Sequence, residues 1–131
     1  MKTILIVEPN SLVAEDIAEM IVDHWMAAHP IVVATPAEAI EALRCGQKPE
    51  GAILRLREQD AAAKRLLSRL KRFGTGFVLI DDVASPSIDG HTPTALVPGA
   101  AYLAQPFTTA EMIAAVERAA TMRNGDTPEL S

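Results

Sequence analysis

Short apolar runs alternate along the chain with longer segments in which apolar residues recur every three or four positions. A continuous apolar run bounded by turn residues is typical of a strand buried on both faces of a parallel sheet. The predicted strands cover residues 3–7, 31–34, 51–56, 77–80 and 101–104. The longer segments have the period of amphipathic helices. We expect helices at residues 11–24, 36–45, 60–73 and 109–124, and a short helical turn at 93–97.

Two of these helices begin with recognisable capping signals. Thr35 stands where a helix cap is expected, with Pro36 at the first helical position and Glu38 three residues after the cap. Thr108 and Glu111 repeat the spacing before the last predicted helix. In such a capping box the two side chains bond to each other's backbone N–H groups, which predicts well-defined starts for both helices.

The first helix is expected to bury one apolar face and to keep its acidic residues away from that face. The predicted inward residues are Leu12, Val13, Ile17, Met20, Ile21 and His24. Trp25 and Met26, at the end of the helix, are expected at the edge of the core.

Alternation of five buried strands with helices predicts a doubly wound α/β fold, a parallel sheet covered on both faces by right-handed crossovers. At 131 residues the chain is large enough for one such core. We expect a single domain over residues 1–124, followed by a flexible tail at 125–131.

Composition narrows the classes of function. The net charge is −5, which argues against nonspecific binding to nucleic acid or to an anionic membrane. No apolar run is long enough to span a bilayer, and no signal-peptide pattern is present. The single cysteine, Cys45, rules out an internal disulfide framework and predicts a cytoplasmic protein.

The helix predicted at residues 60–73 is basic, although the chain as a whole is acidic. Its cations are Lys64, Arg65, Arg69, Lys71 and Arg72. Such a helix can be a docking patch for an acidic partner or nucleic acid, but we interpret it as the solvated face of an amphipathic helix.

Polar residues collect at the carboxyl ends of the predicted strands, where open α/β sheets place their ligands. They are Glu8, Arg55, Asp81, Asp82 and Gln105. The carboxyl ends of parallel strands meet at one edge of the sheet, so we expect these residues to converge on one crevice. Arg55 is the most informative of them because it ends the central strand.

Three stretches resemble the receiver domain of response regulators, a CheY-like, flavodoxin-like three-layer sandwich. They are ILIVE at residues 4–8, AEAIEAL at 37–43 and GAAYLAQPF at 99–107, the last being the most specific. The resemblance implies a five-stranded sheet of order 2-1-3-4-5. It also implies aspartyl phosphorylation at the end of strand three, with Mg²⁺ bound by that aspartate and by acidic residues after strand one.

This chain departs from the receiver pattern at four strand ends. Glu8 keeps the first acidic position, but Pro9 replaces the second, which is the more direct magnesium ligand in the family. Arg55 stands where the phosphoacceptor aspartate is expected, and a guanidinium cannot serve as a nucleophile. Asp81 replaces the usual Thr or Ser, and Gln105 replaces the usual Lys. Only Glu8 and the Pro106–Phe107 pair remain, which predicts a degenerate receiver in which Mg²⁺ binding is lost or weak.

The replacements suggest an internal salt bridge. We hypothesise that Arg55 pairs with Glu8, and with Asp81 or Asp82, in the space of metal and phosphate, because a guanidinium can bind one carboxylate and still donate to another. The alternative is that these side chains are solvated and do not touch.

The expected function is therefore that of an atypical stand-alone receiver, not an enzyme, acting by protein–protein contact. By resemblance, its interaction surface is the helix 4–strand 5–helix 5 face at residues 93–123, with Tyr102, Phe107 and Met112. The expected partners are a kinase, a phosphotransfer protein or a downstream target, and a homodimer is possible; nucleic acid and membrane are not expected. Since the sequence contains no output domain, it is expected to act in trans or to be part of a longer chain.

Two alternatives remain open from the sequence. One is a receiver phosphorylated at another carboxylate, Asp81 or Asp82. The other is a doubly wound domain that binds a small molecule in its crevice, although Glu8, Pro9 and Asn10 stand where a nucleotide-binding domain has a glycine-rich loop.

Overall fold

A computed structural model describes residues 3–46, 48–56, 61–82, 101–105 and 107–122. Five parallel strands form one sheet in the order β2-β1-β3-β4-β5, the order that the receiver resemblance implies. The strands are β1 (Thr3–Val7), β2 (His29–Val33), β3 (Gly51–Leu54), β4 (Gly76–Asp82) and β5 (Ala101–Gln105). Each predicted strand is present, with ends that differ by a few residues.

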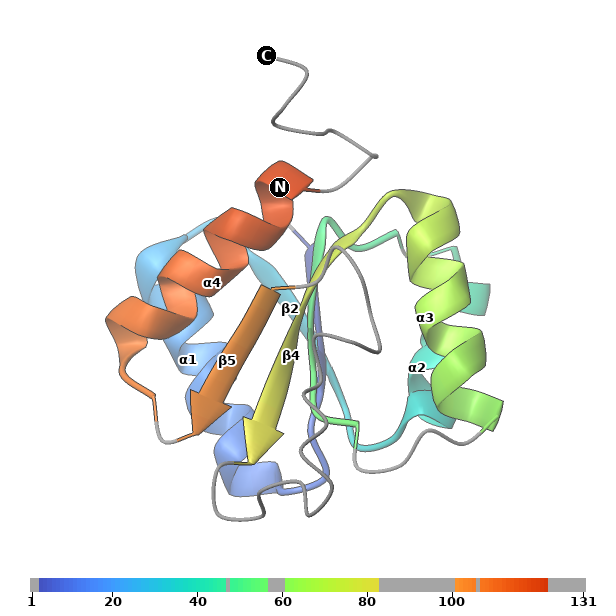
Figure 1. Cartoon of the computed structure of the whole chain (residues 1–131), viewed down its shortest axis with the longest axis horizontal. Helices are drawn as coiled ribbons and strands as arrows, with labels where there is room; N and C mark the ends of the chain where they lie inside the picture. The colour runs from blue at the N-terminus through green and yellow to red at the C-terminus, as the bar shows by residue number, and fades with distance from the viewer. Residues whose placement is uncertain (1–2, 47, 57–60, 83–100, 106, 123–131) are drawn as a thin grey trace, which may run out of the picture.

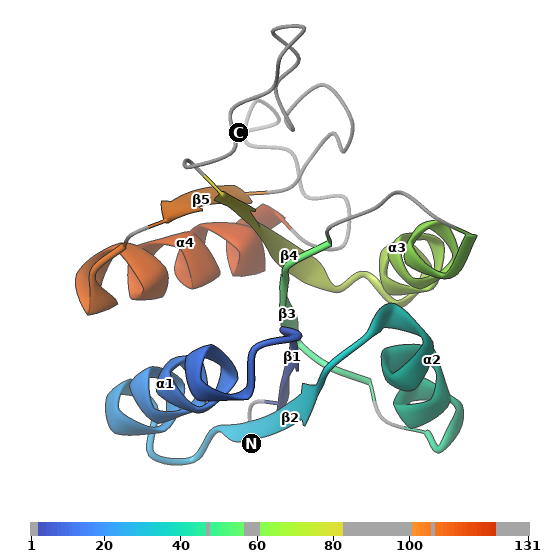
Figure 2. The same ribbon diagram turned by 90° about the horizontal axis from the view of Figure 1, so that it is seen from below.

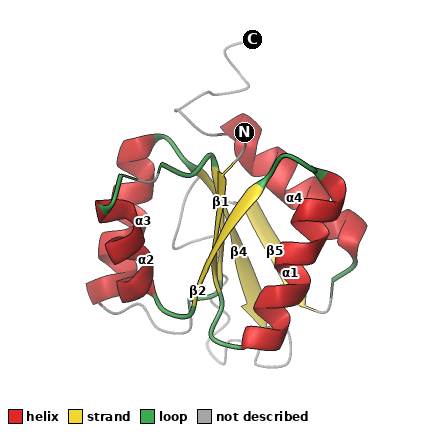
Figure 3. Ribbon diagram, turned by 180° about the vertical axis from the view of Figure 1, so that it is seen from behind, coloured by secondary structure: helices red, strands yellow, loops and turns green. Residues whose placement is uncertain are grey.

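Helices cover both faces of the sheet, so the molecule has three layers (Figures 1 and 2). The helices are α1 (Ser11–His24), α2 (Pro36–Arg44), α3 (Ala61–Phe73) and α4 (Thr109–Met122). α1 and α4 lie on one face, and α2 and α3 lie on the other, as the view from behind also shows (Figure 3). No helix in the described part of the chain is long and apolar enough to cross a membrane.

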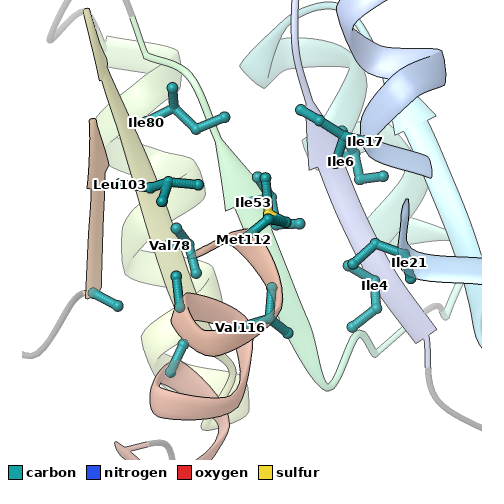
Figure 4. Close-up of a cluster of buried hydrophobic side chains, with 13 residues drawn as sticks. Ile4, Ile6, Ile17, Ile21, Ile53, Val78, Ile80, Leu103, Met112 and Val116 are labelled. Atoms are coloured by element: carbon teal, nitrogen blue, oxygen red, sulfur yellow. The ribbon is translucent and has the colours of Figure 1, made fainter. Parts of the chain in front are cut away.

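Successive strand residues point to opposite faces, so the three central strands β1, β3 and β4 each contribute to two hydrophobic clusters. On β1, Ile4 and Ile6 join the cluster under α1 and α4, whereas Leu5 and Val7 join the cluster under α2 and α3. Ile53 on the central strand β3 is fully buried in the first cluster (Figure 4). Burial on both faces explains why these central strands are apolar runs rather than alternating sequences.

The predicted capping box is complete at α4, whereas at α2 the Thr35 cap is as predicted but Glu38 bonds the residue before the cap. Thr35 Oγ1 accepts the N–H of Glu38 at 3.2 Å, and Glu38 Oε1 accepts the N–H of Ala34 at 2.9 Å. At the start of α4 the exchange is reciprocal: Glu111 Oε1 accepts the Thr108 N–H at 2.8 Å and Thr108 Oγ1 accepts the Glu111 N–H at 3.1 Å. These contacts satisfy backbone donors that have no partner within the helix.

The prediction for the buried face of α1 was wrong at Leu12 and His24, and the prediction that Met26, after the helix, lies at the edge of the core was wrong as well. Leu12 is 72% exposed and Met26 is 88% exposed, and His24 is exposed as well. The buried stripe contains Ala14, Ile17 and Ile21. Leu12 is nine residues before Ile21, which places it on the opposite side of the helix axis. Hydrophobicity alone was therefore a poor guide to which α1 residues face the sheet.

Candidate functional site

Glu8 and Arg55 are neighbours because β1 and β3 are adjacent, parallel and in register. Val7 is paired with Leu54, so the residues that follow them, Glu8 and Arg55, also lie side by side. The Arg55 N–H donates to the Val7 carbonyl at 2.9 Å, and the Glu8 N–H donates to the Val33 carbonyl at 3.0 Å. These bonds continue the strand pairing by one residue and fix both backbones at the carboxyl edge of the sheet.

The salt bridge between Arg55 and Glu8 that we hypothesised from the sequence is present. Arg55 Nε lies 2.6 Å from Glu8 Oε1. The side chain of Glu8 is 2% exposed and that of Arg55 is 11% exposed, so the pair is largely withdrawn from water. A charge-assisted contact of this length is among the stronger hydrogen bonds in proteins. The interpretation in which these two side chains are solvated and apart is therefore wrong.

The second oxygen of the Glu8 carboxylate is also occupied. Glu8 Oε2 accepts the N–H of Asn10 at 3.0 Å, while the Asn10 side chain accepts the N–H groups of Leu12 and Val13 and so caps α1. The sequence gives no direct signal for the contact with Glu8, because the donor is a backbone N–H rather than a side chain. The charge of Glu8 is thus balanced by a cation on one oxygen and a backbone donor on the other.

The remaining predicted site residues are placed only in part. Pro9 is exposed next to Glu8. Asp81 and Asp82 are the last two residues of β4, not the first residues after it, and their backbones are in register with Ala104 and Gln105. Their side chains, that of Gln105 and the whole of Pro106 lie outside the described part of the chain. A contact of Arg55 with Asp81 or Asp82 therefore remains a prediction.

The described side chains at this edge do not fit Mg²⁺. This ion prefers octahedral oxygen coordination, usually with one or two carboxylates. Pro9 offers no side-chain oxygen, Arg55 brings a positive charge, and both oxygens of Glu8 already accept hydrogen bonds. In addition, the described residues contain no group of three or more His, Cys, Asp or Glu side chains arranged to hold a metal ion.

The predicted interaction surface needs one correction. Met112 is fully buried in the cluster between α4 and the sheet, so it does not lie on the surface (Figure 4). Its position in the helix explains this, because Met112, Ile113 and Val116 share the inward stripe of α4. Phe107 is half-buried and packs against the same cluster. The side chain of Tyr102 and all of residues 93–97 lie outside the described residues.

No protein-family model and no curated protein matches the sequence. Solved structures do match the fold. A response regulator receiver protein from Sinorhizobium medicae WSM419 has a TM-score of 0.73 and 23% identity, covering 92% of this chain and 94% of that one. A response regulator receiver protein from Burkholderia phymatum has a TM-score of 0.73 and 19% identity, covering 92% and 95%.

A third similar structure is the receiver domain of a sensor histidine kinase from Pseudomonas aeruginosa PAO1. Its TM-score is 0.70 and its identity 20%, with 91% of this chain and 97% of that chain covered. That domain is described with a magnesium ion coordinated in its active-site cleft. The fold of this protein is thus that of response regulator receiver domains, and the Glu8–Arg55 pair lies at the sheet edge where the resemblance places phosphorylation.

Proposed function

We propose that this protein is a receiver-type domain of two-component signalling that is not phosphorylated at the end of β3 and acts by protein–protein contact. The observation that supports this proposal is the buried salt bridge between Arg55 and Glu8. By the resemblance, Arg55 stands at the phosphoacceptor position. A permanently protonated guanidinium there supplies positive charge but no nucleophile.

The same salt bridge supports the loss of metal-assisted phosphoryl transfer. Such transfer needs a carboxylate nucleophile, a hard cation to neutralise the transferred group, and oxygen ligands for that cation. Glu8 is held by Arg55 and by the Asn10 N–H, and Pro9 has no ligand to offer. We propose that the guanidinium takes over the charge-balancing role of the metal, so that this edge has one stable arrangement without Mg²⁺ or phosphate.

The proposed partners are signalling proteins of the cytoplasm: a kinase, a phosphotransfer protein or a downstream target, with a homodimer as a further possibility. The proposed contact face is the region around β5 and the start of α4. Phe107 is the described side chain that supports this choice, because it is only partly buried where it packs against the core cluster. We propose no enzymatic activity of the domain itself.

Mass spectrometry of the intact chain after incubation with acetyl phosphate and Mg²⁺ tests the proposal. We expect no phosphoryl adduct on the wild type. We also expect none on Arg55→Asp, since Pro9 and Gln105 still lack the ligand and the cation of the receiver pattern. The positive control combines Arg55→Asp, Pro9→Asp and Gln105→Lys, and in this variant we expect Mg²⁺-dependent labelling at residue 55.

Two results would contradict the proposal. Strong labelling of Arg55→Asp alone would mean that the site has lost less than we argue. An adduct on wild-type Asp81 or Asp82, located by peptide mapping and absent from the corresponding Asn variant, would replace our proposal with a receiver that is phosphorylated at another carboxylate.

A further inference from the structure

The outward face of α1 combines apolar and acidic side chains. The exposed large hydrophobic residues among the described part of the chain all belong to α1, to the turn after it or to the adjacent strand β2. They are Leu12 at 72%, Val22 at 38%, Met26 at 88% and Val32 at 46% exposure. Single exposed apolar residues need no explanation; these four share one helix, the turn after it and the strand beside it, so we consider them together as part of one outward surface.

Exposed acidic residues lie on the same helix as Leu12 and Val22. Glu15, Asp16, Glu19 and Asp23 are all exposed, and α1 contains no Lys or Arg. They follow Leu12 by three, four, seven and eleven positions, which is the spacing of a single stripe along a helix. Within the described residues, none of the four forms an ion pair. We call these four residues with Leu12, Val22 and Met26 the α1 surface.

α3 presents the opposite charge. Lys64, Arg65, Lys71 and Arg72 are exposed and Arg69 is half-buried. The helix contains no Asp or Glu, and none of these cations has an ion-pair partner in the described parts of the molecule. Solvation explains why these side chains are exposed, but not why the helix lacks the acidic residues that would relieve repulsion at i, i+4 spacing. We call these five residues the α3 surface.

The two surfaces point away from each other. α1 lies on one face of the sheet and α3 on the other, at opposite corners of the molecule when it is seen along the layers (Figure 2). One molecule therefore cannot bring its own acidic and basic surfaces together. Two copies can do so by a single head-to-tail contact.

We propose that the α1 surface of one copy docks on the α3 surface of a second copy. In this contact the aliphatic stems of lysine and arginine cover Leu12, while their charged ends reach the carboxylates of α1. A second copy is favoured as the occupant because the chain itself carries four acidic residues on one surface and five cations on the other. Nucleic acid is a poorer occupant for α3, because the molecule as a whole has a net charge of −5.

The proposed contact differs from the β5–α4 face and does not depend on whether the domain is phosphorylated. Because it joins two different surfaces, each added copy leaves one surface of each kind open. Assembly should therefore grow with concentration instead of stopping at a dimer. Its electrostatic part should weaken as salt shortens the range of the charges.

Sedimentation velocity of the full chain is the first measurement. At about 0.02 M salt we expect the weight-average mass to rise with protein concentration above the monomer mass of 14.0 kDa. At about 0.5 M salt it should fall back towards the monomer. A monomer at every concentration and at both salt levels would overturn the proposal, as would a monomer that binds DNA through α3.

Charge reversal identifies the surfaces. Glu15→Lys with Glu19→Lys, and separately Arg65→Glu with Arg72→Glu, should each weaken self-association about tenfold or more, because each places like charges opposite one another. An equimolar mixture of the two variants should associate again, since one retains the native α1 surface and the other the native α3 surface. Circular dichroism verifies that both variants are folded.

Matched controls change the net charge equally at other sites. Glu41→Lys with Glu117→Lys, and Arg44→Glu with Lys48→Glu, alter exposed charges outside both surfaces and should leave association within about twofold of wild type. Leu12→Ser should weaken association without any change in charge. If the controls act as strongly as the charge-reversal variants, or if only Phe107→Ala acts, the proposed contact is wrong while the proposed function can still stand.

Discussion

Ile53 and Arg55 lie two residues apart around the end of the central strand, and both are largely withdrawn from water, but different forces hold them. Ile53 is fully buried among aliphatic side chains from β1, β4, α1 and α4. Arg55 is held by directional contacts, among them the 2.6 Å bond from its Nε to Glu8 and the 2.9 Å bond from its backbone N–H to the Val7 carbonyl. The body of the sheet therefore depends on volume and on apolar area. Its carboxyl edge depends on each charge having its partner.

The largest loss of stability is expected in the apolar body of the sheet, at Ile53. Ile53→Ala should lower the free energy of unfolding by about 4 kcal/mol, because it removes apolar contacts and leaves a cavity that the packed sheet cannot close. Ile53→Val, which removes one methylene, should lower it by about 1 kcal/mol. Urea unfolding followed by circular dichroism measures both. Equal effects of the two substitutions would mean that the core near β3 is not closely packed.

At the carboxyl edge of the sheet, replacing one partner of the Arg55–Glu8 salt bridge should lower the free energy of unfolding more than replacing both. Arg55→Met leaves the 2%-exposed Glu8 carboxylate without its cation, and should lower the free energy of unfolding by about 3 kcal/mol. Glu8→Met should lower it by less, since Arg55 is the more exposed partner. The double variant with Met at both positions should return to within about 1 kcal/mol of wild type.

The same urea experiment on the four proteins forms a double-mutant cycle. Additive losses in the double variant would show that Arg55 and Glu8 contribute independently. In that case the salt bridge would not be the element that holds this edge, and the main support for the proposed function would be removed.

The comparison also explains why the fold was easier to predict than the site. Buried strands and amphipathic helices leave periodic signals in local sequence, and the Thr35 and Thr108 caps lie within a few residues of the groups that they bond. Glu8 and Arg55 are separated by 47 positions. Their contact followed from the sequence only after the strand order had been predicted, since register at the ends of adjacent parallel strands brings them together.

Where the prediction was wrong, the position of the residue around the helix axis decided the outcome. Leu12 is as apolar as Ile17, but it lies on the side of α1 that faces away from the sheet. Met112 was expected on an interaction surface from the receiver resemblance, whereas the period of α4 turns it inward.

A third prediction extends the comparison to the opposite edge of the sheet, where a buried polar contact is uncharged. Thr75, 5% exposed, donates through Oγ1 to the Pro49 carbonyl at 2.8 Å just before β4 and β3 begin. Thr75→Val keeps the shape but leaves that carbonyl without its donor, and should lower the free energy of unfolding by about 2 kcal/mol. Thr75→Ser keeps the hydroxyl and should lose less. A Val variant as stable as wild type would mean that water replaces the donor.

The smallest effect is expected where polar contacts are exposed, at the capping box of α4. Thr108→Ala removes the acceptor for the Glu111 N–H, and should lower the free energy of unfolding by about 1 kcal/mol because water can solvate the released donor. Thr108→Ser keeps an acceptor and should restore most of that loss. Thr108→Ala and Thr75→Val each delete one hydroxyl contact, the first exposed and the second buried. Comparing the two in urea unfolding therefore separates the effect of burial from that of the hydrogen bond itself. If Thr108→Ala lowers the free energy of unfolding more than Thr75→Val does, burial does not decide how much each hydroxyl contact stabilises the protein. The contrast between buried and exposed polar contacts would then be wrong.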